Sequence, residues 1–214
     1  MHSEMVNLNL DTLDALPKRC RGCVFWELSP LCADAVSSLS DSGLEKEAWL
    51  SQTLLDWGSC GKIAYHDKTV AGYVIYASPR VVPRAAEFPS GPASADAALL
   101  MTAHVSPLYR GKGIGRSLIQ NAARDLTRRG IRALEAFADQ KGEPDACLVP
   151  ADFCRSVGFK TVCADRHYPR LRLDFRTVDE RYSATASATP DVELEMENID
   201  SFLHALLDEV STKR

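Results

Sequence analysis

Long apolar runs and secretion signals are missing from this chain of 214 residues. No apolar stretch approaches the roughly 18–20 residues that cross a bilayer. The start, Met1-His2-Ser3-Glu4, does not open a basic region followed by an apolar one, as a secretory signal would. Lys and Arg form no dense stripe of the kind that binds nucleic acid. We therefore expect a cytoplasmic protein whose main partner is neither a membrane nor a nucleic acid.

Tightly paired cysteines are also scarce. The seven cysteines run from Cys20 to Cys163, and an odd, scattered set does not suit the disulfide framework of a secreted protein. The tight pair is Cys20 and Cys23, whereas a structural zinc site needs four ligands. Cys32 and Cys60 could complete such a site only by folding toward that pair. We expect free thiols and no metal, with a zinc-dependent interaction module as the alternative.

Acidic residues gather at the end of the chain. The formal net charge is −4, and the stretch from Thr177 to Arg214 holds nine acidic and three basic residues. A Ser/Thr/Ala-rich segment precedes apolar residues at helical spacing. We predict a domain over residues 1–176, a linker over 177–191 and an acidic amphipathic helix over 192–214. The apolar face of that helix would pack on its own domain, on a second copy in a homodimer, or on a partner protein.

The first 176 residues carry alternating strand-like and helix-like patterns. The chain is 45% apolar and 25% charged, which is ordinary for a globular protein. Ser78–Asp96 holds four prolines and is expected to be a long loop. The predicted strands are Val6–Leu10, Lys62–His66, Val70–Ala77, Ala97–Val105, Ile131–Ala138, Lys160–Ala164 and Tyr168–Phe175, and the predicted helices are Pro30–Leu39, Leu44–Trp57, Gly113–Arg129 and Pro150–Val157. This order predicts a mixed α/β fold with one crossover unit.

A glycine-rich turn joins the apolar strand ending at Val105 to the amphipathic helix that follows. Its sequence, Val-Ser-Pro-Leu-Tyr-Arg-Gly-Lys-Gly-Ile-Gly-Arg over 105–116, suits the binding of a pyrophosphate. Glycines let backbone amides converge, and the helix start adds N–H groups and a positive dipole end. The spacing fits neither the Walker A motif nor the dinucleotide fingerprint. A plain glycine-rich turn with solvated basic residues is the structural alternative.

Arg110, Gly113 and Gly115 resemble the acetyl-CoA signature of the GNAT acyltransferase superfamily, Arg/Gln-x-x-Gly-x-Gly/Ala. Gly158-Phe159 resembles the Gly-Phe that follows the last short helix of that family. The resemblance implies a mixed central sheet with helices on both faces. In it, two parallel strands, here Ala97–Val105 and Ile131–Ala138, splay into a V that receives acetyl-CoA. The implied cofactor contacts are Ala103, His104, Val105, Arg110, Gly111, Lys112, Gly113, Ile114, Gly115 and Arg116.

The reaction implied by the resemblance moves an acetyl group from acetyl-CoA to a primary amine without a covalent enzyme intermediate. A base must take the proton of the amine, and the thiolate needs a proton or a donor. Many family members have a Tyr acid four residues before the Gly-Phe glycine, and here that position holds Cys154. Tyr109 and Tyr168 are other possible donors. A small packing residue is the structural alternative for Cys154.

The general base is left open by the sequence. The family often has a Glu on the strand before the loop, but Leu99–Val105 holds no carboxylate and His104 is its titratable residue. Glu135 on the neighbouring strand and Glu27 beside Phe25-Trp26 are further candidates. Alternatively, His104 only packs, and Glu135 is a solvated or ion-paired carboxylate. The aromatic pair Phe25-Trp26 would then belong to the hydrophobic core. A CoA-binding sensor or scaffold without turnover is therefore the alternative to an N-acetyltransferase.

Overall fold

The computed structural model describes residues 4–39, 42–141 and 147–175. The predicted linker over 177–191 and the predicted acidic helix over 192–214, with its expected partners, lie outside these residues. Within the described part of the chain, no helix is long and apolar enough to span a bilayer.

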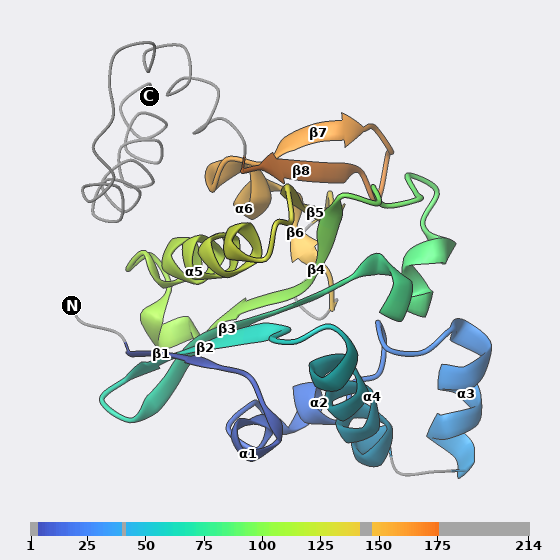
Figure 1. Cartoon of the computed structure of the whole chain (residues 1–214), viewed down its shortest axis with the longest axis vertical. Helices are drawn as coiled ribbons and strands as arrows, with labels where there is room; N and C mark the ends of the chain where they lie inside the picture. Colours follow the sequence, from blue (N-terminus) through green and yellow to red (C-terminus); the bar gives the residue numbers. More distant parts are fainter. Residues whose placement is uncertain (1–3, 40–41, 142–146, 176–214) are drawn as a thin grey trace.

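A sheet of eight strands forms the centre of the domain (Figure 1). Its strand order is β1-β2-β3-β4-β5-β8-β7, and β6 pairs with the end of β5. The β4–β5 and β5–β6 pairs are parallel, and the other neighbours are antiparallel. The strands are β1 (Glu4–Asn7), β2 (Gly61–His66), β3 (Thr69–Ala77), β4 (Ala97–Val105), β5 (Ala133–Asp139), β6 (Val149–Pro150), β7 (Lys160–Cys163) and β8 (Arg170–Asp174).

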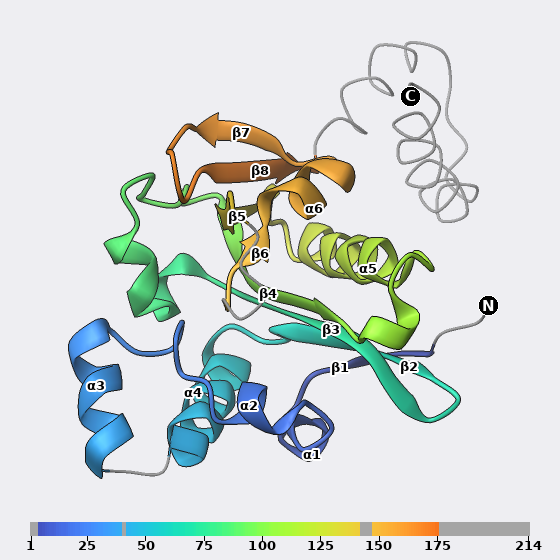
Figure 2. The same ribbon diagram turned by 180° about the vertical axis from the view of Figure 1, so that it is seen from behind.

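Helices cover both faces of this sheet. Helices α5 and α6 lie on one face, and α1, α2 and α4 lie on the other, with α3 farther out (Figures 1 and 2). Three short 3₁₀ turns complete the fold: Pro79–Val81, Pro83–Glu87 and Pro107–Tyr109. The α-helices are α1 (Leu10–Leu13), α2 (Lys18–Arg21), α3 (Pro30–Leu39), α4 (Ser42–Asp56), α5 (Ile114–Arg128) and α6 (Ala151–Ser156).

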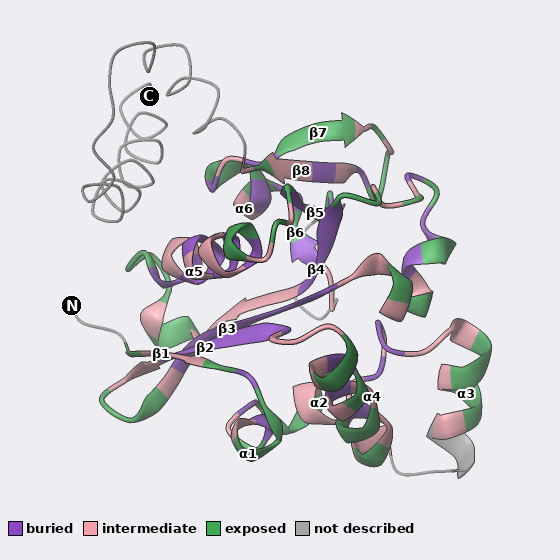
Figure 3. Cartoon of the chain, in the orientation of Figure 1, coloured by how far each residue is buried: buried purple, intermediate pink, exposed green. Residues whose placement is uncertain are grey.

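Two hydrophobic clusters, one on each face, hold the layers together. The first joins α5 and α6 to the sheet and includes Leu118, Leu126 and Leu134. The second lies beneath the N-terminal helices and includes Trp26 and Phe137. Buried residues accordingly run along the central strands and the inner side of α5 (Figure 3). Because the apolar residues of α5 recur every three or four positions, this helix turns one face to the sheet.

The predicted mixed α/β fold with helices on both faces is confirmed. The predicted strand Ala97–Val105 and helix Pro30–Leu39 have the observed bounds, and the other predicted elements agree within a few residues. The first predicted strand, Val6–Leu10, was placed too late in the chain, because β1 spans Glu4–Asn7. Asn9 caps α1 through a reciprocal pair of hydrogen bonds with Thr12, so Leu10 begins a helix instead of extending the strand.

The strands β4 and β5 pair over a short distance and then separate. Their parallel register covers Ala97–Leu99 opposite Ala133–Glu135, although both strands continue beyond it. In the pairing with β3, Leu100 faces Tyr76 and Thr102 faces Ile75, so Met101 is an extra residue. Such a bulge bends and twists its strand. The bulge thus lies where β4 leaves β5, and it accounts for the V between these strands.

Candidate functional site

The glycine turn after β4 is an exposed cradle at the start of α5. Gly111 and Gly113 have φ values of +71° and +80°, which glycine tolerates far better than other residues. A Cβ built on either residue would have no heavy atom within 4 Å. Gly113 is the N-cap of α5, and no side chain in the described part of the chain caps this end by a hydrogen bond. The turn therefore offers open backbone at the positive end of a helix dipole.

Gly115 serves a different purpose from the other two glycines. It is buried in the first turn of α5, and a Cβ there would lie 2.8 Å from Phe153 Cε2. The missing side chain lets α5 approach Phe153 of α6. Ile114 is buried as well, so these two predicted contact residues can offer only backbone groups to a ligand. Local sequence could not reveal this packing role, because Phe153 lies far along the chain.

Three basic side chains surround the turn. Arg110 is exposed, and its Nε donates a hydrogen bond to the Val105 carbonyl at 3.2 Å. Lys112 is exposed and lies 5.4 Å from the ring centre of Tyr109. Arg116 donates to the Ser156 carbonyl at 3.3 Å, which ties α5 to α6. The turn therefore combines open backbone with positive charge, as an anion site requires.

The end of β4 has a free side toward the V. Ser106 N–H donates to Ala71 of the β3 side at 2.9 Å. Backbone groups of alternate residues point the same way, so those of His104 also face β3. Those of Ala103 and Val105 face the side from which β5 has diverged. Of the three residues predicted to contact the cofactor on this strand, Ala103 and Val105 therefore have backbone groups that point outward and can pair with an added extended chain.

His104 lies on this splayed part of β4, on the face away from α5. Its ring stacks on Tyr73 of β3, with ring centres 5.4 Å apart. Burial lowers the pKa of His104, and the positive charges of Arg110 and Arg19 lower it further. The imidazole is therefore neutral at neutral pH and can accept a proton. The Tyr73 hydroxyl is buried and accepts or donates no hydrogen bond within the described residues.

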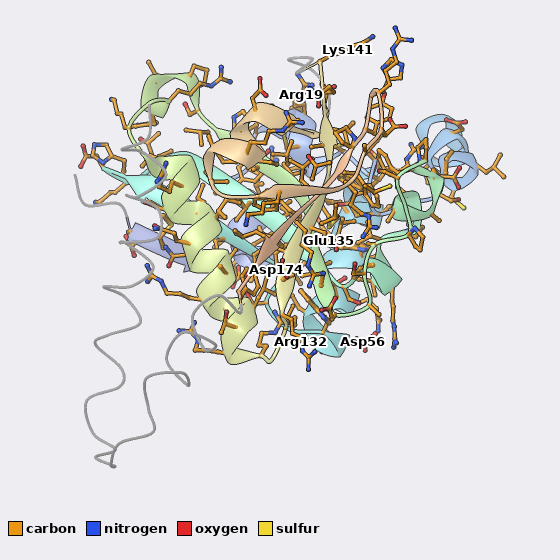
Figure 4. All side chains as sticks on the ribbon, turned by 90° about the horizontal axis from the view of Figure 1, so that it is seen from above. Arg19, Asp56, Arg132, Glu135, Lys141 and Asp174 are labelled. Carbon is orange, nitrogen blue, oxygen red and sulfur yellow. The ribbon has the colours of Figure 1, made fainter. Side chains whose placement is uncertain are left out.

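Glu135 is held in an ion-pair network at the closed base of the V. It is fully buried and accepts hydrogen bonds from Arg170 at 2.8 Å, Arg172 at 3.0 Å and the Ser94 amide at 3.0 Å. Burial would raise the Glu135 pKa, but these hydrogen bonds outweigh it and hold the pKa below its ordinary value. Figure 4 labels Glu135 near the middle of its view. This environment favours a structural carboxylate.

The same network fixes the long loop before β4. Arg170 also donates to the Ser90 carbonyl at 2.9 Å and the Ser94 hydroxyl at 3.1 Å. Arg172 forms a bidentate pair with Asp96 at 3.0 and 2.9 Å. The predicted long loop Ser78–Asp96 is therefore a packed connection, and it contains two 3₁₀ turns.

Glu27 is likewise engaged in an ion pair. It is 4% exposed and pairs with Lys46 of α4, which is 5% exposed. Lys46 Nζ also donates to the Cys23 carbonyl at 3.1 Å. The second oxygen, Oε2, is buried and has no partner among the described residues. The neighbouring Trp26 is 2% exposed and stacks on Phe88, so it belongs to the core instead of lining an open pocket.

Cys154 is sealed in the cluster between α6 and the sheet. It is fully buried, and this burial raises the pKa of the thiol to about 12. The position favours packing over proton donation. Tyr168 is partly exposed and packs edge-on against Phe88, and Tyr109 packs edge-on against His66. Of the four predicted catalytic side chains, His104 has the setting that best suits proton transfer.

The alternative zinc site is not supported. Cys60 is buried in the core, whereas Cys32 is exposed on α3. Over residues 4–39, 42–141 and 147–175, no group of three or more His, Cys, Asp or Glu could hold a metal ion. Cys23 instead lies beside Cys147, a residue that the sequence did not single out.

Comparisons with known proteins agree with this geometry. The model of the "Acetyltransferase (GNAT) family" matches residues 26–147. Comparison with curated proteins gives no significant match.

Solved structures share the fold at low sequence identity. The paia N-acetyltransferase of Thermoplasma acidophilum, in complex with coenzyme A, is 16% identical, with a TM-score of 0.55 over 82% of this chain and 100% of that one. An N-acetyltransferase of Staphylococcus aureus Mu50 is 18% identical, with a TM-score of 0.51 over 81% and 99%. The protein yncA of Salmonella typhimurium, with its cofactor acetyl-CoA, is 15% identical, with a TM-score of 0.52 over 90% and 99%.

Proposed function

The chain belongs to the GNAT acetyltransferase family, and we propose that it transfers an acetyl group from acetyl-CoA to a primary amine. The observation that carries the proposal is the opening of the sheet directly above the glycine turn. There β4 continues past its pairing with β5 and ends at an exposed, basic helix N-terminus. Family membership supports this choice of substrate, as do two solved structures of similar fold that contain coenzyme A or acetyl-CoA.

The residues present suit the two ends of acetyl-CoA. The turn from Arg110 to Gly113 supplies positive charge and unobstructed backbone for the pyrophosphate. Ala103 and Val105 supply backbone groups that can pair with the amide-containing pantetheine arm. In this arrangement the thioester reaches the part of β4 that carries His104. The Arg110 hydrogen bond to Val105 links the two binding regions.

His104 is the base in this proposal. The amine attacks the thioester carbonyl after losing a proton, and a neutral imidazole accepts that proton. Burial, and to a lesser extent the charges of Arg110 and Arg19, lowers the pKa of His104 and so favours the unprotonated imidazole. Glu27 and Glu135 already have cationic partners. The departing thiol takes its proton from solvent, since Cys154 is sealed in the core.

Thiol release with a panel of amines tests the activity. Amino acids, polyamines, aminoglycosides and peptides are each mixed with the full chain and acetyl-CoA, and acetylated products are identified by mass. His104→Gln is expected to lower kcat by about 10²–10⁴-fold and to leave CoA affinity nearly unchanged. His66→Gln is the matched control, because His66 is also half-buried and also contacts a tyrosine ring at 5.4 Å.

The pH profile separates a base from a packing residue. Activity should fall as pH drops through the His104 pKa, which lies below the ordinary value of about 6.5. Arg110→Ala removes a nearby positive charge, so the acid limb should move to higher pH. A profile that keeps the same acid limb in Arg110→Ala and His104→Gln would remove His104 from the mechanism.

A CoA-binding module without turnover is the second candidate. The engagement of Glu27 and Glu135 in ion pairs and the sealed position of Cys154 favour it. CoA binding without thiol release or acetylated product across the whole panel would select this function over catalysis.

A further inference from the structure

Two cysteines far apart in sequence meet beside the V. Cys23 follows α2, and Cys147 lies two residues before β6, the short strand that pairs with the end of β5. Their sulfur atoms are 3.0 Å apart, and both are free thiols. Each residue is partly exposed, so a small molecule in solvent can reach the pair.

Buried side chains fix the backbone of both cysteines. Lys46 Nζ donates to the Cys23 carbonyl at 3.1 Å, and Trp26 Nε1 donates to the Cys147 carbonyl at 3.0 Å. Lys46 is itself locked in its buried ion pair with Glu27. Buried side chains of the domain therefore keep the two sulfur atoms close together.

The two thiols differ in their chemistry. The hydrogen bond from Cys147 lowers the pKa of Cys23 to about 6, with help from the Phe25 amide and the Lys46 charge and against the effect of burial. The same contact raises the pKa of Cys147. Near neutral pH, Cys23 is therefore a thiolate and Cys147 a thiol. By contrast, burial raises the pKa of both Cys60 and Cys154 to about 12.

We propose that Cys23 and Cys147 form a redox-active dithiol that a hydroperoxide oxidises to a disulfide. The Cys23 thiolate attacks one peroxide oxygen, the O–O bond breaks, and Cys23 becomes a sulfenic acid. Cys147 then attacks that sulfur, and water leaves as the S–S bond forms. The two thiols lose two electrons, and the peroxide is reduced. A disulfide bond of about 2.05 Å requires the sulfurs to approach by about 1 Å.

The site is independent of acetyl transfer in its chemistry, but it lies near Tyr73, the ring that stacks on the proposed base. Tyr73, which stacks on His104, has its phenol pKa raised first by burial and then by the neighbouring Cys20, Cys147 and Cys23. Oxidation of Cys23 removes the negative charge of its thiolate from the surroundings of Tyr73. The disulfide would also tie the segment after α2 to the start of β6.

Oxidation of the full chain followed by mass mapping tests the proposal. The reduced protein is freed of reductant, treated with hydrogen peroxide, blocked with iodoacetamide and digested with trypsin. Trypsin leaves Cys20 on the dipeptide 20–21, Cys23 on peptide 22–46 and Cys147 on peptide 142–155. We expect peptides 22–46 and 142–155 to be joined, with fragmentation placing the bond between Cys23 and Cys147.

Serine variants assign the two sulfurs. Cys23→Ser and Cys147→Ser should each abolish the joined peptide. Cys32→Ser and Cys154→Ser should keep it, which matters because Cys32 shares a tryptic peptide with Cys23 and Cys154 shares one with Cys147. Cys147→Ser should also move the midpoint of Cys23 alkylation from about pH 6 toward the ordinary value of about 8.5.

Three outcomes would overturn the proposal. They are a Cys20–Cys23 bond in place of the expected one, a bond between two chains, and peroxide treatment that leaves Cys23 and Cys147 open to alkylation. None of these readouts uses acetyl transfer, so failure of the proposed enzymatic function would not affect the result.

Discussion

Gly113 offers a sharp test of the glycine turn, because Gly130 provides a matched control. Both residues have positive φ, +80° and +74°, and a Cβ on either would have no heavy atom within 4 Å. Replacing either with Ala forces an L residue into the left-handed region, at a cost of about 1–2 kcal/mol. For a domain of this size, that corresponds to a fall in Tm of roughly 2–8 °C.

The two variants should differ in their effect on cofactor binding. We expect the turn to need a positive φ at residue 113 to hold the pyrophosphate. In Gly113→Ala the free protein can relax to a negative φ, so the strained positive φ must be adopted again when CoA binds. A cost of 1–2 kcal/mol raises the Kd for CoA by roughly 5–30-fold. Gly130→Ala lies beyond the far end of α5 and should leave this Kd unchanged.

Calorimetric titration with CoA and thermal melting together provide the assay. The expected result is a lower Tm in Gly130→Ala and, because Gly113→Ala relaxes when free, a smaller loss of Tm with a weaker Kd in Gly113→Ala. Equal CoA affinity in the wild type and Gly113→Ala at an equal Tm would refute the assignment of this turn to the pyrophosphate. Equal weakening in both variants would refute the local explanation.

Three further outcomes follow from the contacts at the site. Arg110→Ala should weaken CoA binding by about 1.5–3 kcal/mol, as titration would show, because a charge-assisted contact is lost. Cys154→Ala should lower stability by about 1 kcal/mol with kcat unchanged in the thiol-release assay, since the thiol packs and does not face the thioester. Glu135→Gln should lower the free energy of unfolding by about 3 kcal/mol in denaturant titration, because Arg170 and Arg172 lose a buried anion. Because the folded Glu135 pKa is lowered, its ionised carboxylate stabilises the fold at pH values above the unfolded pKa of about 4.3. This stabilisation is lost as the pH falls through the lower folded pKa. The free energy of unfolding of Glu135→Gln should therefore depend less on pH below about pH 4 than that of the wild type.

The sequence predicted best those parts of the fold that depend on local pattern. The spacing of apolar residues in α5 and the glycines before it determine one helix and its start, whatever the rest of the chain does. Ala97–Val105 was recognisable because a predominantly apolar run between turn residues suits a central strand. The glycine turn before α5 was therefore the most predictable part of the candidate site.

Features that depend on distant contacts could not be predicted in this way. A glutamate has the same local sequence whether it faces substrate or, like Glu135, two arginines of the following hairpin. Cys154 occupies the expected position in the motif, but its burial depends on how α6 packs on the sheet. Cys23 and Cys147 are separated by 124 positions, and no pattern in the sequence links them.

The bulge at Met101 has a consequence for how such a cleft can arise or disappear in evolution. Before the bulge, Ala98 and Leu100 turn toward α5, and after it Ala103 and Val105 do so. The bend in β4 is therefore set by one additional backbone unit and not by the choice of any side chain. Losing that single codon would restore regular pairing with β3, keep His104 opposite Tyr73 on the same face, and remove the main cause of the strand separation. The cleft therefore depends on a one-residue insertion in β4. Substitutions in the surrounding residues can adjust its shape but cannot create it.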